Sequence, residues 1–207
     1  MSPQTWQEWL AEKRAMSQMT ATVIPLSGVQ PWGLQEDRKR FGRPDGGFFS
    51  LVGVHVVAQR EVQDWKQPLL KETGEGAVVL ICAWISEQPR YLLAARQEPG
   101  NTTKPGNVLL GPSLQTSWSN LQQTHGGKRP PRAELLDGHD VKWVTLAMDG
   151  GRFFGKVVRY ATVEETRSER IVLVDNERWF TRDELREAYS AGELNEHLCQ
   201  VLLGAVL

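Results

Sequence analysis

The chain reads REVQDWKQPLL from Arg60 to Leu70, directly after an apolar, strand-like segment that spans Phe48–Val57. Ordinary half-buried strands do not end in so dense a mixture of aromatic, amide, acidic and basic side chains. Three later runs have the same character: EPGN at Glu98–Asn101, PSLQTSWSN at Pro112–Asn120, and GGRFF at Gly150–Phe154. Ligands are commonly held by loops at the ends of strands, so these four runs mark the candidate binding site.

Size and composition limit the function classes. A chain of 207 residues can bury a hydrophobic core, and 40% hydrophobic with 24% charged residues is typical of a soluble globular protein. The net charge of -1 offers no electrostatic footprint for nucleic acid or an anionic membrane. The longest apolar run, Ala77–Ile85, is too short to cross a bilayer, and the first residues lack a signal-peptide pattern. We therefore expect a cytoplasmic protein that binds neither nucleic acid nor membrane.

Motifs for metal, phosphate and nucleophilic chemistry do not occur in the sequence. There is no phosphate-binding G-x-x-x-x-G-K-[ST] loop, no G-x-G-x-x-G, no G-x-S-x-G and no H-E-x-x-H. The two cysteines, Cys82 and Cys199, and the four histidines have no metal-ligand spacing. The cysteines are expected to be small core residues in a reducing compartment. No metal and no cofactor are expected.

Helices are expected towards the two ends of the chain. Residues 4–19 have the pattern of an amphipathic helix. Thr181 is followed three residues later by Glu184, a capping-box pattern that begins a helix, and Gly192 ends it. A last helix is expected from about Leu194 to the C-terminus.

Strands are expected between these helices, with a hairpin turn at Ser86–Pro89. The predicted strands are Phe48–Arg60, Ala77–Ile85, Arg90–Arg96, Val141–Leu146, Phe153–Val163 and Ile171–Val174. Connections are predicted at Trp65–Glu75, Gln97–Pro112 and His125–Arg132, where Pro, Gly or basic residues are frequent, and Leu114–Gln123 favours neither helix nor strand. Strands that come before helices, without regular alternation, indicate an α+β domain with a mixed sheet rather than a doubly wound fold.

The polar runs carry the candidate site residues. Glu98 precedes Pro-Gly, which forces a turn and directs the carboxylate, and Asn101 closes that turn. Arg152 follows two glycines, so its guanidinium could meet a phosphate bidentately. Arg159 and Tyr160 add a cation and a phenol on opposite faces of a strand. Amides and hydroxyls suited to the edges of a sugar or base come from Gln115, Thr116, Ser119 and Asn120. A solvated acidic turn and a loop capped by its own side chains are the alternative interpretations.

The four runs resemble the NDP-hexose 2,3-dehydratases of deoxysugar biosynthesis. The resemblance covers about Gly46 to Leu203. Its matching positions are Phe48–Ser50, Gly53–Val54, Arg60–Val62, Trp65, Gln67–Leu70, Glu98–Asn101, Pro112, Gln115, Thr116, Ser119–Asn120, Gly150–Phe153, Arg159–Tyr160 and Leu194–Asn195. It implies a Nudix-like mixed β-sheet flanked by helices, as one module (46–207) after an N-terminal helix and extended arm (1–45). Because family members carry two such modules, the resemblance also implies a homodimer.

The resemblance implies a lyase. These enzymes remove the C2 hydroxyl of a nucleotide-linked 4-keto-6-deoxyhexose, and a base that takes the C3 hydrogen drives the elimination. We expect catalytic roles for Glu98, Gln115 and Asp149, with Glu98 as the base. We expect substrate binding by Arg60, Glu61, Trp65, Gln67, Asn101, Thr116, Ser119, Asn120, Arg152, Arg159 and Tyr160. Nudix hydrolysis is not expected, because Arg60-Glu61 is not followed by paired glutamates.

The chain also departs from the family pattern. Ala147, Met148 and Asp149 stand where the family tends to carry Ser and acidic residues. Small or apolar residues at other expected polar positions are Gly47, Gly155, Val157, Val158 and Cys199. A site that has lost hydrogen-bonding groups suits a less polar ligand. Two alternatives therefore stay open: a repurposed dehydratase, isomerase or cyclase of natural-product biosynthesis acting on an apolar, non-nucleotide intermediate, and a non-catalytic module that binds a nucleotide sugar.

Overall fold

The computed structural model describes residues 4–36, 39–46, 48–72, 74–123, 129–137, 140–165 and 171–206. Its helices are α1 (Trp6–Met16), α2 (Trp118–Leu121), α3 (Arg182–Ser190) and α4 (Glu196–Val206), with short 3-10 helices η1 (Leu26–Gly28), η2 (Pro105–Asn107) and η3 (Ala133–Leu136). Its strands are β1 (Gly33–Leu34), β2 (Arg40–Gly42), β3 (Phe49–Val57), β4 (Asp64–Glu72), β5 (Gly76–Ile85), β6 (Gln88–Gln97), β7 (Val108–Pro112), β8 (Leu114–Ser117), β9 (Val144–Ala147), β10 (Val157–Glu164) and β11 (Glu177–Phe180).

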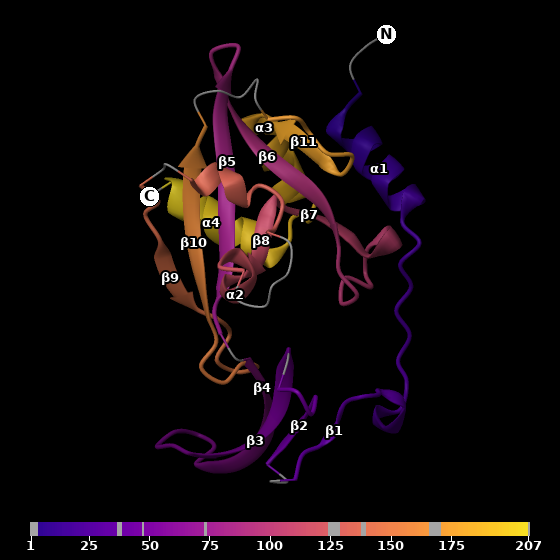
Figure 1. The fold of residues 1–207 in the computed structure, drawn as a ribbon, viewed down its shortest axis with the longest axis vertical. Coiled ribbons are helices and arrows are strands. Elements are labelled where there is room, and N and C mark those ends of the chain that lie inside the picture. Colours follow the sequence, from indigo (N-terminus) through magenta and orange to yellow (C-terminus); the bar gives the residue numbers. More distant parts are fainter. Residues whose placement is uncertain are drawn as a thin grey trace. The chain divides into compact units, whose positions relative to one another are not determined.

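The strands form two sheets (Figure 1). One has the order β1-β2-β3-β4, and the other has the order β11-β6-β5-β10-β9, with β7 paired to β6 and β8 paired to β5. The predicted α+β class is confirmed. The chain divides into two compact units: unit 1 comprises Met1–Thr22, Ala77–Val144 and Arg159–Leu207, and unit 2 comprises Val23–Gly76 and Thr145–Val158. The division into an arm (1–45) and a module (46–207) stays a prediction.

Unit 1 is organised around the β5–β6 hairpin. The run from Ala77 to Ile81 is completely buried, although successive side chains of a strand point to opposite faces. Both faces are therefore covered, and the unbroken apolar run follows from that. On one face Val79 and Ile81 pack with Leu92, Leu114, Val163 and partly buried residues that include Trp143 and Trp179.

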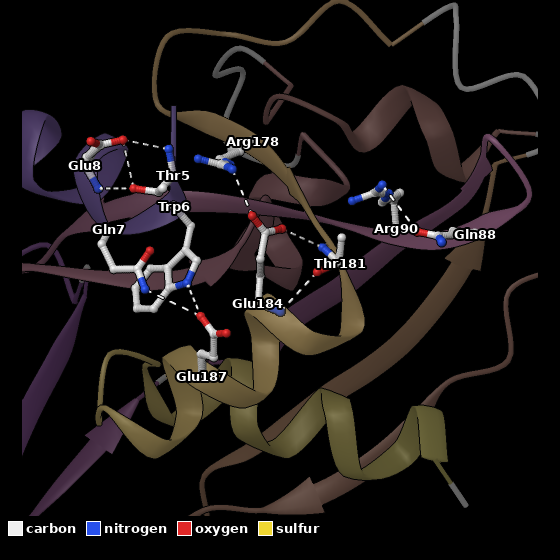
Figure 2. Close-up of polar contacts among 10 residues, drawn as sticks. All are labelled: Thr5, Trp6, Gln7, Glu8, Gln88, Arg90, Arg178, Thr181, Glu184 and Glu187. Atoms are coloured by element: carbon white, nitrogen blue, oxygen red, sulfur yellow. Dashed lines mark hydrogen bonds and ion pairs between the residues drawn. The ribbon is translucent and has the colours of Figure 1, made fainter. Parts of the chain in front are cut away.

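The first turns of helices α1 and α3 are each capped by two side chains. Thr181 and Glu184 form the capping box that the sequence predicts for α3, and Thr5 and Glu8 form a second one, which the sequence analysis does not name, for α1 (Figure 2). Gly192, at a φ of 67°, follows the end of α3. Figure 2 also shows the side chain of Trp6 directed at α3, where its indole N–H donates to Glu187 at 3.0 Å. These bonds satisfy helix-end donors and join α1 to α3 within unit 1.

Two predicted connections contain strands. Trp65–Glu75 was expected to be a loop because of Pro68, yet Asp64–Glu72 is the nine-residue strand β4, paired antiparallel with β3. Pro68 is tolerated because β4 lies at the edge of its sheet, where a missing N–H leaves no partner unsatisfied. The predicted loop Gln97–Pro112 likewise ends in β7, which pairs with β6.

The last predicted strand is also wrong. Ile171–Val174 contains no strand, and the strand lies further on, at Glu177–Phe180, where β11 pairs with β6. Other boundaries moved by a few residues. The helix expected at 4–19 is Trp6–Met16, and the strand expected at Phe153–Val163 is Val157–Glu164. Pairing with a distant strand decides the boundaries of the strands, and the local pattern does not contain that pairing.

Unit 2 has far fewer buried side chains. In β3 every residue is exposed or half-buried, and in β4 only Leu69 is buried. The sheet is extended by Arg152–Phe154, which lie about 80 residues later in the sequence than β4. The N–H of Leu70 donates to the carbonyl of Arg152, and the N–H of Phe154 donates to the carbonyl of Leu70, both at 2.8 Å. The REVQDWKQPLL and GGRFF runs therefore lie side by side.

Candidate functional site

Glu98 is held by two amide side chains. Its Oε1 accepts a hydrogen bond from Gln115 Nε2 at 3.0 Å, and its Oε2 accepts one from Asn101 Nδ2 at 3.3 Å. The backbone closes the same turn, because the N–H of Asn101 donates to the carbonyl of Glu98 at 3.0 Å. About a third of the Glu98 side chain is exposed. The carboxylate is therefore fixed in direction and still open to a ligand.

Asn195 completes this network from the other end of the chain. Its Nδ2 donates to Gln115 Oε1 at 3.0 Å, and its Oδ1 accepts from the N–H of Leu198 at 2.9 Å, which caps α4. The side chain is almost fully buried. Its backbone N–H donates to the carbonyl of Leu110 in β7. Pairing of this segment with β7 is what brings the start of α4 to Glu98.

Arg96 adds a cation to the network. Its Nε lies 3.7 Å from Glu98 Oε1 and has no hydrogen-bond partner, although that nitrogen is buried. Burial lowers the pKa of Arg96, and the negative charge of Glu98 acts in the opposite direction. Gly111 makes room for this arrangement. A Cβ at position 111 would clash with Arg96 Cδ and would lie 2.8 Å from Asn195 Nδ2.

Two cavities meet at Gln115. The first, of about 280 Å³, is lined by Glu98, Asn101, Leu109, Gln115, Leu194, Asn195, Glu196 and His197. We call it the Glu98 cavity. The second, of about 410 Å³, is lined by Gln115, Thr116 and Asn120 together with Arg96, Asn176 and others. Unit 1 therefore gathers five predicted site residues around two adjoining hollows.

Tyr160 and His197 form a pair beside the Glu98 cavity. The hydroxyl of Tyr160 lies 2.9 Å from Nδ1 of His197, the second residue of α4. Tyr160 is buried, and burial, with a smaller contribution from the charge of Glu196, raises the pKa of Tyr160 to about 12. The phenol is therefore neutral at physiological pH. The neighbouring Arg159 contacts another element, since its guanidinium lies 4.2 Å from the ring centroid of Trp118.

The remaining predicted residues lie in unit 2. The indole N–H of Trp65 donates to Gln67 Oε1 at 2.9 Å, and Gln67 Nε2 donates to the carbonyl of Gly151 at 3.1 Å. The guanidinium of Arg60 lies 5.9 Å from the centroid of the Trp65 ring. These contacts connect three predicted site residues to the GGRFF run.

Asp149 and Arg152 lie at the same turn of unit 2. Asp149 Oδ1 accepts from the N–H of Gly151 at 2.8 Å, and Oδ2 lies 3.3 Å from Arg152 Nε. The side chain of Arg152 is 81% exposed, and Glu61 is exposed in the turn between β3 and β4. Convergence of Trp65 and Gln67 with Glu98 on one cavity stays a prediction. The side chain of Ser119 and the residue Gly47 lie outside the described part of the chain.

Several residues that line or support the candidate site have little or no signal in the sequence. Arg96, Gly111 and His197 carry no local signal, because a basic residue in a strand, a glycine in a loop-like run and a lone histidine are all common. Asn195 had one signal, its match to the dehydratases, but was not assigned to the site. Their proximity to Glu98 depends on β7 and α4, which the sequence alone does not place together.

The described residues include no metal-binding cluster and no cysteine with a lowered pKa. Among them, no group of three or more His, Cys, Asp and Glu side chains is placed to hold a metal ion. Both cysteines are free and half-buried, and burial raises the pKa of Cys82 to about 12, with a further contribution from Glu164. Within the same residues, the helices are too short or too polar to span a bilayer.

Comparison with known proteins decides the family. The family model described as NDP-hexose 2,3-dehydratase matches residues 4–203. The chain belongs to the NDP-hexose 2,3-dehydratase family. That range includes the Glu98 cavity of unit 1 and the Trp65–Gln67 contacts of unit 2, so both groups of polar side chains are part of the family's module.

Curated relatives in this family carry one name, dTDP-4-dehydro-6-deoxy-alpha-D-glucopyranose 2,3-dehydratase. The protein of Streptomyces violaceoruber is 30% identical over 203 residues, which are 96% of this chain and 44% of the relative. The protein of Saccharopolyspora spinosa is 29% identical, over 86% of this chain and 37% of the relative. The protein of Amycolatopsis orientalis is 26% identical, over 86% of this chain and 39% of the relative. The chain therefore spans less than half the length of these dehydratases.

Solved structures that are similar to the chain include two nucleotide hydrolases. C. elegans Ap4A hydrolase matches with a TM-score of 0.39 and 14% identity, over 66% of this chain and 100% of that structure. An ADP compounds hydrolase matches with a TM-score of 0.45 and 13% identity, over 76% of this chain and 84% of that structure. At this level of similarity the two hydrolases are not evidence about the activity of this member of the dehydratase family.

Proposed function

We propose that this chain is a dehydratase that removes water from a nucleotide-linked 4-keto-6-deoxyhexose, with Glu98 as the base. The observation that carries the proposal is the fixed carboxylate of Glu98, held on both oxygens by Gln115 and Asn101 at the edge of a polar cavity. A base must point at the proton that it abstracts, and hydrogen bonds to neighbouring amides provide that direction. Family membership supports the reaction class.

The chemistry follows from the 4-keto group. That group acidifies the C3 hydrogen, so Glu98 takes the C3 proton and the electron pair of the C3–H bond becomes the C2–C3 double bond. The C2–O bond breaks, and the hydroxyl leaves with a proton as water. The product is an enol at C3, which tautomerises to the 3,4-diketo sugar. No oxidant or reductant is consumed, because the hexose loses only water.

The surrounding side chains have supporting roles in this proposal. Gln115 and Asn101 orient Glu98, and Asn195 holds Gln115 in turn. Arg96 is the cation beside the carboxylate and offsets the negative charge that develops on the reacting sugar. Taken by itself, unit 2 offers Arg152, whose exposed guanidinium is of the kind that suits a phosphate or diphosphate.

A polar substrate is favoured over an apolar one. The Glu98 cavity is lined mostly by carboxylate, amide and imidazole side chains, with Leu109 and Leu194 as the apolar members. A sugar can add hydrogen bonds to these polar groups, whereas an apolar ligand would displace water from them without replacing the hydrogen bonds of that water. The homodimer and the cytoplasmic location stay proposals alongside this function.

The test is to incubate the protein with dTDP-4-dehydro-6-deoxy-α-D-glucopyranose in D2O and follow two signals by NMR. Loss of the C3 hydrogen signal measures proton abstraction by the base. Replacement of the signal of the hydroxyl-bearing C2 by that of a C2 without oxygen measures elimination. Glu98→Gln keeps the shape and removes the base, so both rates should fall by about a hundredfold or more. Glu87→Gln, an exposed acid in the β5–β6 turn, is the matched control and should change neither rate.

The outcomes separate the competing functions. Unchanged rates in Glu98→Gln would remove Glu98 from the mechanism and direct attention to Asp149 or Glu61. A wild-type protein that gains thermal stability with the nucleotide sugar, yet neither exchanges C3 nor eliminates, would be a binding module. Stabilisation by apolar ligands alone would favour the natural-product alternative.

A further inference from the structure

Helix α1 ends against the loop between β6 and β7. The hydroxyl of Ser17, the C-cap residue of α1, donates to the carbonyl of Gly106 at 2.7 Å. In the last turn of the helix, Nη2 of Arg14 donates to the carbonyl of Val108 at 3.0 Å. Gly106 has a φ of 62°, and a Cβ there would lie only 2.8 Å from the carbonyl oxygen of Arg14. The end of α1 therefore holds the loop at the two carbonyls on either side of Asn107.

Asn107 connects these carbonyls to Glu98, at the start of the same loop. The backbone N–H of Glu98 donates to the carbonyl of Asn107 at 3.1 Å, and Nδ2 of Asn107 donates to the carbonyl of Pro99 at 3.1 Å. Asn107 has a φ of 57°, which is uncommon for a residue other than glycine, so its contacts help to keep it in that conformation. The backbone position of Glu98 therefore depends on the part of the loop that α1 holds.

An ion pair of α1 supports Glu98 by a second route. Arg14 also contacts the carboxylate of Glu193, and both side chains are largely buried. Two residues after Glu193, Asn195 begins the series of amide hydrogen bonds that ends at the carboxylate of Glu98. Arg14 therefore contributes to the backbone position of Glu98 and to the direction of its side chain.

We propose that Arg14 and Ser17 are positioning residues for the dehydration, and that they hold Glu98 in the direction that proton abstraction requires; this inference rests on the proposed function. We call the contacts of these two residues with the loop and with Glu193 the α1 clasp. Neither residue lines the Glu98 cavity, so both act through the loop. A displacement of about 1 Å can lower a rate by about a hundredfold, so a base that is loosely held is a poor one.

Two neighbouring variants of α1 separate positioning from stability. Arg14→Met removes the main contacts of the clasp, whereas Lys13→Met removes an ion pair of the same helix with Asp175, at 2.9 Å. Arg14→Met should lower kcat for C3 exchange by about 10–100-fold and change KM by less than about threefold, because the base is displaced while other substrate contacts remain. Lys13→Met should leave kcat and KM unchanged.

Ser17→Ala is an independent test that keeps the charges of the clasp. It removes the hydrogen bond to Gly106 and leaves the pair of Arg14 with Glu193 in place. Loss of one hydrogen bond predicts a fall in kcat of about threefold to tenfold. Thermal melts establish that each variant is folded, and Ser17→Ala decides the question if Arg14→Met does not fold.

Amide hydrogen exchange tests the clasp without relying on activity. The backbone N–H of Glu98 should exchange at least about tenfold faster in Arg14→Met and at the wild-type rate in Lys13→Met. Unchanged amide exchange in Arg14→Met and Ser17→Ala, normal kcat in both, or an equal loss of kcat in Lys13→Met would overturn the positioning role while Glu98 stands as the base. A wild-type protein without C3 exchange would overturn the proposed function and the role of the clasp in it, even if the amide exchange follows the prediction.

Discussion

The four polar runs are distributed between two regions with different physical character. In unit 1, Glu98 and Gln115 belong to a network of partly buried amides and charges, supported by a core that is buried on both faces of β5. In unit 2, Trp65, Gln67 and Arg152 lie on a sheet with few buried side chains, and Arg152 is 81% exposed. Unit 1 holds these polar groups in a partly buried network, whereas in unit 2 Trp65 and Gln67 are half-buried and Arg152 is largely exposed.

This difference leads us to propose different roles for the polar residues of the two units. Acid–base chemistry needs groups held in direction by packing and by further hydrogen bonds, and unit 1 provides both. Binding of a charged, hydrated group such as a diphosphate needs exposed cations, and Arg152 of unit 2 is one. Variants in unit 1 should therefore change stability and turnover, whereas variants in unit 2 should change ligand affinity with little effect on stability.

The largest difference should appear when an aromatic ring is removed from each unit. Phe180 is fully buried and packs against Trp6 and Trp9, so Phe180→Ala should lower the free energy of unfolding by about 3–5 kcal/mol. Phe49 is 41% exposed beside Trp32, and Phe49→Ala should cost about 1 kcal/mol, the value of an aromatic pair. Urea unfolding measures both, and equal losses would contradict the contrast between the units.

A single methyl group at Gly111 should disturb the network itself. Gly111→Ala would push against Arg96 and Asn195, so it should cost about 1–3 kcal/mol of stability and also reduce turnover. Gly53→Ala in β3 is the matched control, because a Cβ there meets nothing within 4 Å. Denaturant unfolding and the C3 exchange assay report the two effects. Normal turnover in a destabilised Gly111→Ala would show that the network is structural only.

Acid should weaken the attachment of α1 to the rest of unit 1 through Glu193. Burial acts to raise the pKa of Glu193, but hydrogen bonds and charges from Arg14 and Lys104 outweigh it and lower that pKa. A lowered folded-state pKa means that this stabilisation is present above the unfolded value of about 4.3 and is lost as the pH falls through the folded value. Glu193→Gln should cost about 1 kcal/mol at pH 7.

Melting curves of the wild type and of Glu193→Gln, recorded between pH 7 and pH 3, measure this effect. The two melting temperatures should differ at neutral pH and approach each other in acid, where the wild-type carboxylate also becomes neutral. A constant difference across that range would mean that the substitution acts through packing rather than through charge.

The smallest effect on stability is expected at Trp65. Trp65→Phe keeps a ring near Arg60 but removes the N–H that orients Gln67, so stability should change by about 0.5 kcal/mol or less. Titration calorimetry with dTDP should show affinity weakened by up to about tenfold, or 1.4 kcal/mol. C3 exchange at saturating substrate should stay unchanged. A normal dissociation constant for dTDP would remove Trp65 from the proposed nucleotide site.

Local patterns predicted much of the fold. The hairpin of β5 and β6 follows from two apolar runs around a turn, and α3 begins at Thr181 because its capping box is complete within four residues. Both features depend only on residues that are close together in the sequence, so a local pattern is enough to predict them. The strands β4 and β7 were missed because Pro68 and a glycine-rich run suggest loops, and only pairing with β3 and β6 makes them strands.

The sequence by itself determined the family of this protein and the polar runs, including Glu98, Asn101 and Gln115. Only the tertiary structure decided that Asn195 and His197 reach the same cavity as Glu98, about a hundred residues away in the chain. That proximity depends on α4 being joined to β7 through the backbone of Leu110 and Asn195. Such contacts arise from the packing of distant segments, whereas a sequence pattern reports only the preferences of neighbouring residues.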